Sequence, residues 1–336
     1  MSTHSILTDA ILPDAFLSIF QPILERVTDP LFQVYGLGAA AVLSAAGALL
    51  LVLRSKLGDE GFAKVWATYR SWWIMIPLVL AVVALGRTAV IVALALVAAL
   101  GVREFASATG LARDRWMSAT VYIGVAAVAL LSWLPDPRLD GQGWYGMFMA
   151  LPVYVVAAIL TVPVLRNRHA GQLQRIGLAL AAFIYFGWMF GHLGFLANAE
   201  AGMGYLLYLC FAVVAGDVAA YTFGRLFGRH ALRDQISPNK TLEGALGSAA
   251  LSMLLPFLLR FSFPDFSLVQ LLLTGLIVGV GGQLGDLTIS TFKRDLGIKD
   301  MGASIPGHGG VLDRVDSLIF VAPLFFHMVR WTEGLA

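Results

Sequence analysis

Residues 266–329 read FSLVQLLLTGLIVGVGGQLGDLTISTFKRDLGIKDMGASIPGHGGVLDRVDSLIFVAPLFFHMV, two apolar runs with a polar segment between them. The runs, 266–289 and 311–329, are close to the length of roughly 20 residues that a helix needs to cross the hydrocarbon core of a bilayer. The segment between them, 290–310, carries cations, carboxylates and glycines. This pattern predicts two membrane-spanning helices joined by a polar loop at one membrane surface.

The rest of the chain is similarly apolar. Of its 336 residues, 58% are hydrophobic and 13% are charged, and the mean hydropathy is +0.79, which excludes a soluble domain of this length. We therefore predict an all-α, polytopic transmembrane helix bundle of about nine to ten spans. The candidate spans lie near residues 32–53, 73–86, 88–102, 117–134, 144–165, 176–196, 203–223, 243–259, 266–289 and 311–329.

Two of these runs, on either side of Arg87, are short for a membrane crossing. The runs 73–86 and 88–102 fall below the length that a span requires, so two full spans and a re-entrant hairpin both remain open. The single cysteine, Cys210, lies in an apolar run and cannot form an internal disulfide.

Residues 1–30 form a separate N-terminal segment. They carry four acidic residues and one basic residue, Arg26, so the basic start of a signal peptide is missing and no cleavage is expected. The segment is too short and too charged to span, and we expect it to lie in the membrane interface, with packing on the bundle as the alternative. We divide the remainder into a transmembrane scaffold, 31–200, and a C-terminal transmembrane region, 201–336, which carries charge inside its spans.

The distribution of basic residues predicts the orientation of the bundle. Lys and Arg concentrate in cytoplasmic loops, and the segments between the spans alternate between basic and non-basic along this chain. The basic segments are therefore predicted to be cytoplasmic and both termini external. Eighteen of the 23 Lys and Arg lie in 54–72, 103–116, 166–175, 224–242 and 290–310 or at Arg314.

Two carboxylates lie inside predicted spans. Asp217 lies six residues before Phe223, the predicted cytoplasmic end of its span, which places it about 9 Å deep at the 1.5 Å rise of a helix. Asp286 is placed similarly, and a glycine precedes each of them. Ionisable groups at such a depth are costly and mark a functional site by default, although an internal salt bridge is the structural alternative.

The helix start after the polar segment suits an anion held beside a metal. Gly309 and Gly310 allow positive φ and close backbone approach, and the first amides of the following helix lack intrahelical partners. Asp313 and Asp316 are three residues apart and share a face, where two oxygen ligands suit Mg²⁺. A solvated loop that caps the helix is the alternative.

The four carboxylates Asp217, Asp286, Asp313 and Asp316 are expected to converge from three spans at one depth. Such a group is repulsive without cations, so it predicts one or more bound metal ions. Glu243 either joins the group or stabilises the N-terminus of its own helix. Partial counter-charges would come from Lys240, Lys293, Arg294 and Arg314.

The polar segment resembles the signature of the phosphatidate cytidylyltransferase (CDP-diacylglycerol synthase) family. The resemblance rests on Ser290-x-Phe292-Lys293-Arg294, then Lys299-Asp300-x-Gly302, then Ile305-Pro306-x-His308-Gly309-Gly310-Val311-x-Asp313-Arg314-Val315-Asp316. A second block agrees, with Asp217-x-x-Ala220-Tyr221-x-x-Gly224-Arg225-x-x-Gly228 and Ile236-Ser237-Pro238-x-Lys240-Thr241-x-Glu243-Gly244. The likeness covers the C-terminal third of the chain well, and the first 200 residues only in their general hydrophobicity.

The resemblance implies an enzyme of phospholipid biosynthesis that joins CTP and phosphatidate into CDP-diacylglycerol and releases pyrophosphate. It further implies a bacterial-type inner (plasma) membrane, catalytic loops facing the cytoplasm, and CTP, phosphatidic acid and membrane lipids as partners, with no nucleic acid. Assembly into a homo-oligomer stays open. The residues expected to be catalytic are Asp217, Lys240, Asp286, Lys293, Arg294, Asp313 and Asp316.

The same resemblance implies binding roles. Mg²⁺, with room for a second, monovalent cation such as K⁺, would be held by Asp217, Asp286, Asp313 and Asp316. The residues expected to bind substrate are Arg225, Ser237, Lys240, Thr241, Glu243, Lys299, His308, Gly309, Gly310 and Arg314.

Two other functions use similar parts. A CTP-dependent lipid kinase would transfer the γ-phosphate and release CDP where the synthase releases pyrophosphate. An ion-coupled transporter would use Asp217 and Asp286 as its ion site, but such transporters have helices broken near the midplane and often inverted repeats, neither of which the sequence shows.

Overall fold

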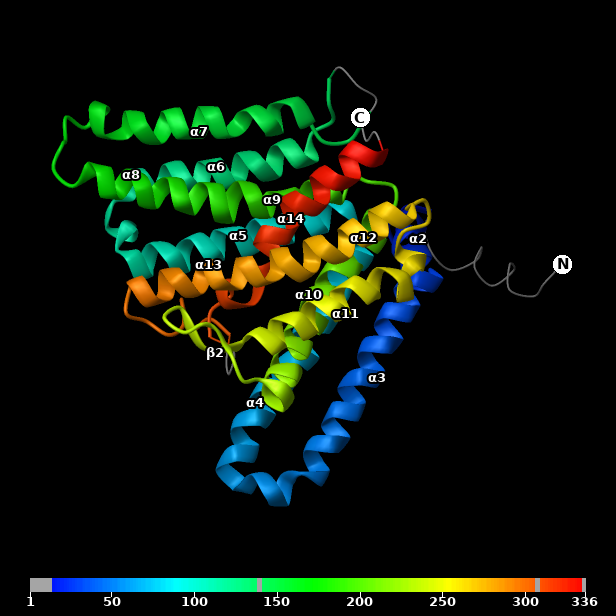
Figure 1. Ribbon diagram of the computed structural model, residues 1–336. Coiled ribbons are helices and arrows are strands. Elements are labelled where there is room, and N and C mark those ends of the chain that lie inside the picture. The colour runs from blue at the N-terminus through cyan, green and yellow to red at the C-terminus, as the bar shows by residue number, and fades with distance from the viewer. Residues whose placement is uncertain (1–13, 138–140, 306–308, 334–336) are drawn as a thin grey trace. The chain divides into compact units, whose positions relative to one another are not determined.

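The computed structural model describes residues 14–137, 141–305 and 309–333. The chain forms two compact units, Met1–Val90 and Ile91–Ala336, each described here by itself. The fold class is all-α apart from one short hairpin (Figure 1).

From Asp14 onward, where its description begins, the first unit contains α2 (Asp14–Thr28), α3 (Pro30–Val52) and α4 (Arg54–Leu85). Asp29 caps α3 by accepting a 2.8 Å hydrogen bond from the Leu31 amide. Helix α2 packs on α3 and α4, and Arg26 Nη1 donates to the Ala84 carbonyl over 3.3 Å. The interfacial position of residues 1–30 stays a prediction.

The second unit holds the remaining helices around α14, and its elements follow in chain order. They are α5 (Arg87–Thr109), which begins in the first unit, η1 (Leu111–Arg113), α6 (Arg115–Trp133), α7 (Tyr145–Leu165), α8 (Gln172–Ala181), η2 (Ala182–Met189), α9 (Phe190–Leu196), α10 (Gly202–Phe227), β1 (Ala231–Arg233), β2 (Ser237–Thr241), α11 (Leu242–Leu258), η3 (Arg260–Ser262), α12 (Leu268–Leu276), η4 (Ile277–Gly281), α13 (Gly282–Asp295) and α14 (Leu312–Glu333).

The predicted polytopic bundle is confirmed. Within the described ranges, eight helical runs are long and apolar enough to cross a membrane. Helix α11 is a shorter apolar helix, and α14, with 22 residues, corresponds to the last predicted run. The eight runs are Pro30–Val52, Gly58–Leu85, Arg87–Thr109, Arg115–Trp133, Tyr145–Leu165, Gln172–Leu196, Gly202–Phe227 and Leu268–Asp295.

The two short runs around Arg87 belong to longer helices. The run 73–86 lies in Gly58–Leu85, which has 28 residues, and the run 88–102 lies in Arg87–Thr109, which has 23. Both exceed the roughly 20 residues that a span needs, so two full spans fit without a re-entrant hairpin. The prediction underestimated both lengths because polar residues continue each helix beyond its apolar part.

Two of the spanning runs contain π-helical turns that the sequence did not predict. The segment η2 joins α8 to α9, and η4 joins α12 to α13. A π turn holds one extra residue per turn and so changes which face the following side chains occupy, and such turns are frequent at functional sites. Because η4 ends just before α13, it fixes the face on which Asp286 projects.

The hairpin of β1 and β2 lies in the predicted cytoplasmic loop 224–242. Its strands pair antiparallel, with Ala231 opposite Thr241 and Arg233 opposite Ser237. The segment has no alternating apolar pattern, and its second strand contains Pro238, so the usual strand signal is absent. The hairpin nevertheless matters to the site because β2 carries Lys240.

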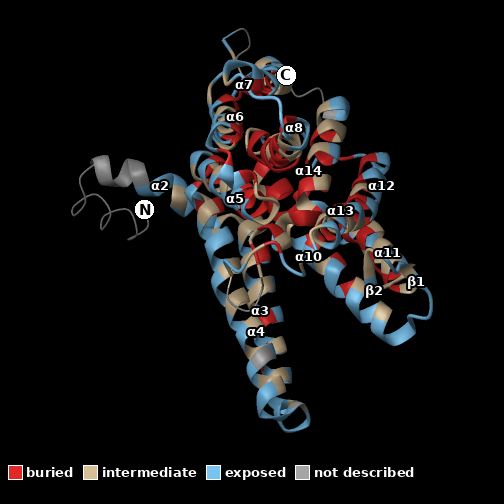
Figure 2. Ribbon diagram, turned by 90° about the vertical axis from the view of Figure 1, so that its left-hand side faces the viewer, coloured by how far each residue is buried: buried red, intermediate tan, exposed pale blue. Residues whose placement is uncertain are grey.

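The core of the second unit surrounds α14. Buried residues concentrate on the helices around it (Figure 2), and α14 contacts α9, α10, α12 and α13. Val321, Phe325 and Val329 are fully buried, and the Phe325 ring lies 5.6 Å from that of Tyr205. Helix α14 is thus held along its length, which gives its first turn a fixed position.

A buried ion-pair group holds the start of α6. The Asp114 carboxylate caps α6 through the Met117 amide and accepts hydrogen bonds from Arg166 at 2.6 Å and Arg175 at 2.8 Å. Burial alone would raise the pKa of Asp114, but this amide and the two guanidinium groups outweigh it and hold the pKa below its usual value. These contacts fix the C-terminal end of α7, at Arg166, and the beginning of α8 to the start of α6.

Candidate active site

The candidate site lies on α10, α13 and α14, beside the β1–β2 hairpin. The two predicted functional segments meet here, because Arg294 Nε at the end of α13 donates to the Ile236 carbonyl of the hairpin over 3.1 Å. Helix α10 ends at Phe227 instead of the predicted Phe223, so Asp217 lies further from its helix end than predicted. Residues Gly224–Phe227 add one more turn to the predicted helix.

Three carboxylates from three helices lie near enough for their charges to act on one another. They are Asp217 on α10, Asp286 on α13 and Asp316 on α14. Asp217 is exposed, Asp286 is half-buried and Asp316 is buried, with 8% of its surface exposed. The three acids therefore lead from an accessible surface into the protein.

Close contact between α13 and α14 brings two of these acids together. Gly285 lies against α14, and a Cβ atom at this position would lie 2.9 Å from the Ser317 Cα atom, besides contacting the Asp316 carbonyl. Only glycine therefore fits without moving one of the helices. The glycine that precedes Asp286 in the sequence brings the backbones of the Asp286 and Asp316 helices into contact.

Two lysines neutralise part of this negative charge. Lys240 Nζ forms an ion pair with Asp286, and Lys293 Nζ lies 2.9 Å from Asp313 Oδ1. Lys240 and Arg314 also attract the charge of Asp217, and Lys293 attracts that of Asp316. Strands and helices far apart in sequence thus supply cations to the same group of acids.

Asp313 differs from the other three acids because loop amides occupy its carboxylate. Its Oδ2 atom accepts hydrogen bonds of 3.0 Å from the amides of Met301 and Gly310, while Oδ1 faces Lys293. Gly309, beside it, has a φ of 79°, the positive value that its glycine predicts. In this arrangement Asp313 holds the polar loop on the start of α14.

The donor set fits a hard divalent cation. The described residues contain no ready-made group of three or more His, Cys, Asp or Glu arranged around a metal. Asp217, Asp286 and Asp316 nevertheless supply oxygen atoms and mutually repelling charge, which Mg²⁺ would neutralise. Asp313 is the least available of the four predicted ligands, because Lys293 and two amides already bind it.

Several predicted substrate-binding residues lie around the site without joining the acids. Glu243 accepts from His230 Nδ1 at 2.6 Å and from the Arg229 and His230 amides, which ties the hairpin to α11. Thr241 caps α11 through the Gly244 amide at 3.1 Å. The remaining predicted residues are Arg225, which donates to Tyr221, Ser237 in β2, the exposed Lys299, and His308, which lies outside the described residues. Arg314 is also exposed but differs from them, because it attracts the charge of Asp217.

Glu104, which was not among the residues predicted from the sequence, lies at this site. Glu104 lies in α5, and its buried carboxylate accepts hydrogen bonds from Ser304, Val311 and Leu312. The segment 103–116 was interpreted only as a basic loop. Glu104 follows the predicted apolar run 88–102 with only Arg103 between them, so it was assigned to the loop, whereas Asp217 and Asp286 were identified because they lie inside predicted spans.

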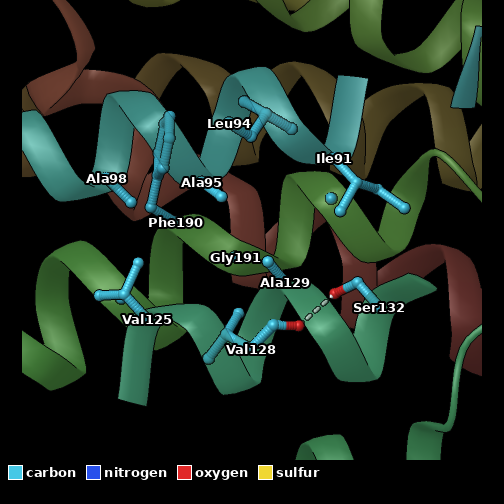
Figure 3. Close-up of a pocket in the computed structure, with 12 residues that line it drawn as sticks. Ile91, Leu94, Ala95, Ala98, Val125, Val128, Ala129, Ser132, Phe190 and Gly191 are labelled. Carbon is cyan, nitrogen blue, oxygen red and sulfur yellow. Dashed lines mark hydrogen bonds between the residues drawn. The ribbon is translucent and has the colours of Figure 1, made fainter. Parts of the chain in front are cut away.

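An apolar pocket lies away from these charges, among α5, α6, η2 and α9 (Figure 3). Ala95, Val125 and Phe190 are among its lining residues, and its one polar lining side chain, Ser132, donates to the Val128 carbonyl at 2.9 Å. With that hydroxyl already bound, the described lining offers no group for a phosphate or a metal. The pocket is therefore separate from the candidate site.

The family match includes every residue of the candidate site. A family model described as the cytidylyltransferase family matches residues 66–332. A phosphatidate cytidylyltransferase of Staphylococcus haemolyticus is 44% identical over 161 residues, 47% of this chain and 60% of that protein. One of Staphylococcus saprophyticus is 37% identical over 195 residues, 57% of this chain and 70% of that protein. The uncharacterized protein YnbB of Escherichia coli is 29% identical over 282 residues, 82% of this chain and 91% of that protein.

Proposed function

Since this chain belongs to the cytidylyltransferase family and is a membrane-embedded nucleotidyltransferase, we propose that it transfers the cytidylyl group of CTP to phosphatidate. The products are CDP-diacylglycerol and pyrophosphate. The observation that carries the proposal is the group of Asp217, Asp286 and Asp316 with Lys240 and Lys293 at one site. The lysines suit two phosphate-bearing substrates, and the acids suit the cation that accompanies the phosphates.

The reaction exchanges one phosphoanhydride bond for another. An oxygen of the phosphatidate phosphate attacks the α-phosphorus of CTP, and the bond from that phosphorus to the oxygen bridging the β-phosphate breaks. The bridging oxygen keeps the electron pair and leaves with pyrophosphate. A phosphate monoester has its second pKa at about 6, so the attacking oxygen is largely ionised near neutral pH without a strong base.

The protein contributes positioning and positive charge. Transfers of this type depend mostly on alignment of the attacking and leaving oxygens and on neutralisation of phosphate charge. Lys240, Lys293 and Arg314 attract the charge of the acids and are the cations that we assign to the phosphate oxygens. The amides of Gly310, Val311 and Leu312 already donate to Asp313 and Glu104, so side chains supply the positive charge. We assign His308, which directly precedes Gly309 in the sequence, to substrate binding.

A divalent cation completes this proposal. Asp217, Asp286 and Asp316 would hold Mg²⁺, which supplies charge neutralisation at the phosphate oxygens when bound. The repulsion among the three acids supports this assignment. A second, monovalent cation such as K⁺ is compatible with the number of carboxylates.

We expect purified protein to place the label of CTP carrying a radioactive α-phosphorus into a chloroform-soluble liponucleotide when phosphatidate and Mg²⁺ are present. Pyrophosphate should appear in equal amount. Label carried at the γ-phosphorus should stay in the aqueous phase. Transfer of the γ-label to lipid would identify a lipid kinase instead, and no consumption of CTP would overturn the proposed reaction.

We also propose that the site faces the cytoplasm from a bacterial inner membrane, supported by the concentration of Lys and Arg in the segments around it. Gln235→Cys, exposed in the hairpin and made in a Cys210→Ser background, should resist an impermeant maleimide on intact spheroplasts and react after permeabilisation. Asp265→Cys, exposed between α11 and α12, is the matched control and should react on intact spheroplasts. The opposite labelling pattern would show an inverted topology.

A further inference from the structure

We propose that Glu104 is a positioning residue that fastens residues 301–305 and 309–311, the described parts of the signature loop, to α5 and so sets the position of the first turn of α14. The expected effect on turnover rests on the cytidylyl transfer proposed above. The attachment of the loop by Glu104 is argued from contacts within the second unit alone.

Glu104 receives hydrogen bonds from both ends of the loop. Its Oε1 atom accepts from Ser304 Oγ at 2.6 Å and from the Val311 amide at 2.9 Å, and its Oε2 atom accepts from the Leu312 amide at 2.9 Å. Hydrogen bonds to an ionised carboxylate are short and strong. The side chain also lies at the N-terminus of α14, where the helix dipole favours negative charge. The carboxylate therefore serves as a cap for α14 supplied by a distant helix.

The glycines of the loop fit closely around this carboxylate. A Cβ atom at Gly302 would lie 2.7 Å from Glu104 Cδ, and a Cβ atom at Gly310 would collide with Glu104 Oε2. Both contacts are closer than a real Cβ atom tolerates. Neither glycine has a positive φ, so glycine at these positions leaves space for the Glu104 side chain and, at Gly310, also for the Gly302 backbone nitrogen, which would lie 2.9 Å from a Cβ atom.

The loop is held from two sides at once. Glu104 binds it from α5, while Asp313 binds the Met301 and Gly310 amides from α14. Between these fastenings, the Ile305 amide donates to the Gly309 carbonyl at 2.9 Å, which brings the two ends of the turn together. Helix α14, which carries Asp313 and Asp316, is consequently fixed to α5 as well as to α13.

A buried carboxylate in a membrane helix is costly unless its partners compensate it. Apolar packing alone does not account for Glu104, because three donors converge on a side chain that is 6% exposed. A misplacement of about 1 Å at a reacting centre can cost about 100-fold in rate. Loss of this fastening should therefore lower turnover although Glu104 lies outside the group of acids and lysines.

Glu104→Gln keeps the shape of the side chain but replaces one acceptor oxygen by a donor, which faces an amide or hydroxyl that also donates. We expect kcat for CDP-diacylglycerol formation to fall by about 10- to 100-fold with a smaller change in KM. Hydrogen–deuterium exchange of the purified protein should become faster in peptides covering 301–315. Exchange in peptides covering 115–165 and the thermal midpoint in detergent should stay close to those of the wild type.

Gly302→Ala provides a second, independent variant, because its methyl group would displace the same carboxylate. It should reproduce both the loss of kcat and the faster hydrogen–deuterium exchange over 301–315. In a Glu104→Ala background, where the space is free, Gly302→Ala should lower kcat by a smaller factor. Matched controls are Glu200→Gln, an exposed acid, and Gly177→Ala, which has open space at its Cβ position. Both should behave as the wild type.

Unchanged exchange over 301–315 in Glu104→Gln, or faster exchange across all peptides with a matching fall in thermal midpoint, would overturn the fastening role. Full additivity of Gly302→Ala and Glu104→Ala would overturn it too. A wild-type protein that forms no liponucleotide would instead refute the proposed reaction, while the exchange comparison still decides whether Glu104 holds the loop.

Discussion

We expect Asp316→Asn to lower turnover by at least about 100-fold, on the order of 3 kcal/mol of transition-state stabilisation, while the protein accumulates normally. The substitution keeps the size of the side chain and an oxygen for the Ser317 amide, which donates to it at 2.7 Å, but removes one negative charge. Asp217→Asn and Asp286→Asn should behave alike, because all three acids belong to the same repelling group. The measurement is kcat for liponucleotide formation by purified protein.

Asp265→Asn is the matched control, because this acid is exposed between α11 and α12. Its effect should stay within about 0.5 kcal/mol, as is usual for surface substitutions. Near-normal turnover in the three site variants, with normal accumulation, would show that these carboxylates do not form a catalytic site.

Removal of divalent cations should abolish turnover. The acids of α10, α13 and α14 repel one another, and a bound Mg²⁺ would offset that repulsion and the charge of the incoming phosphates. We expect exhaustive chelation to leave no detectable liponucleotide, and Mg²⁺ in excess of the chelator to restore the activity.

A binding measurement separates a site on the protein from a role of Mg²⁺ on CTP alone. A ligand that binds only the folded state raises its stability, so Mg²⁺ without nucleotide should raise the thermal midpoint of the wild type. The same addition should have little effect on Asp316→Asn. Full activity after chelation, or an equal shift in both proteins, would contradict a metal held by these acids.

Much of the fold could be predicted because long apolar runs allow few structures in a bilayer. Each predicted run lies, to within about two residues at its ends, in one helix or in a series of consecutive helical elements, since a membrane-spanning segment must satisfy its own backbone hydrogen bonds. Helix ends were less predictable, because polar residues such as Arg103 and Glu104 continue α5 to Thr109. The π turns η2 and η4 and the hairpin were not predicted, since tertiary packing and not a local pattern determines them.

The acids of the site could be found from the sequence because charge inside an apolar run is costly. That reasoning identified Asp217 and Asp286, but it could not pair them with particular cations. The contacts of Lys240 with Asp286 and of Lys293 with Asp313 depend on how the hairpin and α13 lie against the acids. Glu104 was not predicted for the same reason, since its partners are about 200 residues away in the chain.

The contact of Gly285 with α14 has a consequence for the choice of ion. Because main chain touches main chain there, the spacing between the Asp286 and Asp316 side chains is set by parts of the protein that cannot yield as a flexible side chain would. Mg²⁺ requires oxygen atoms at about 2.0–2.1 Å, whereas Ca²⁺ requires about 2.3–2.6 Å. A cation shared by these two acids would therefore be selected by its radius as well as by its charge.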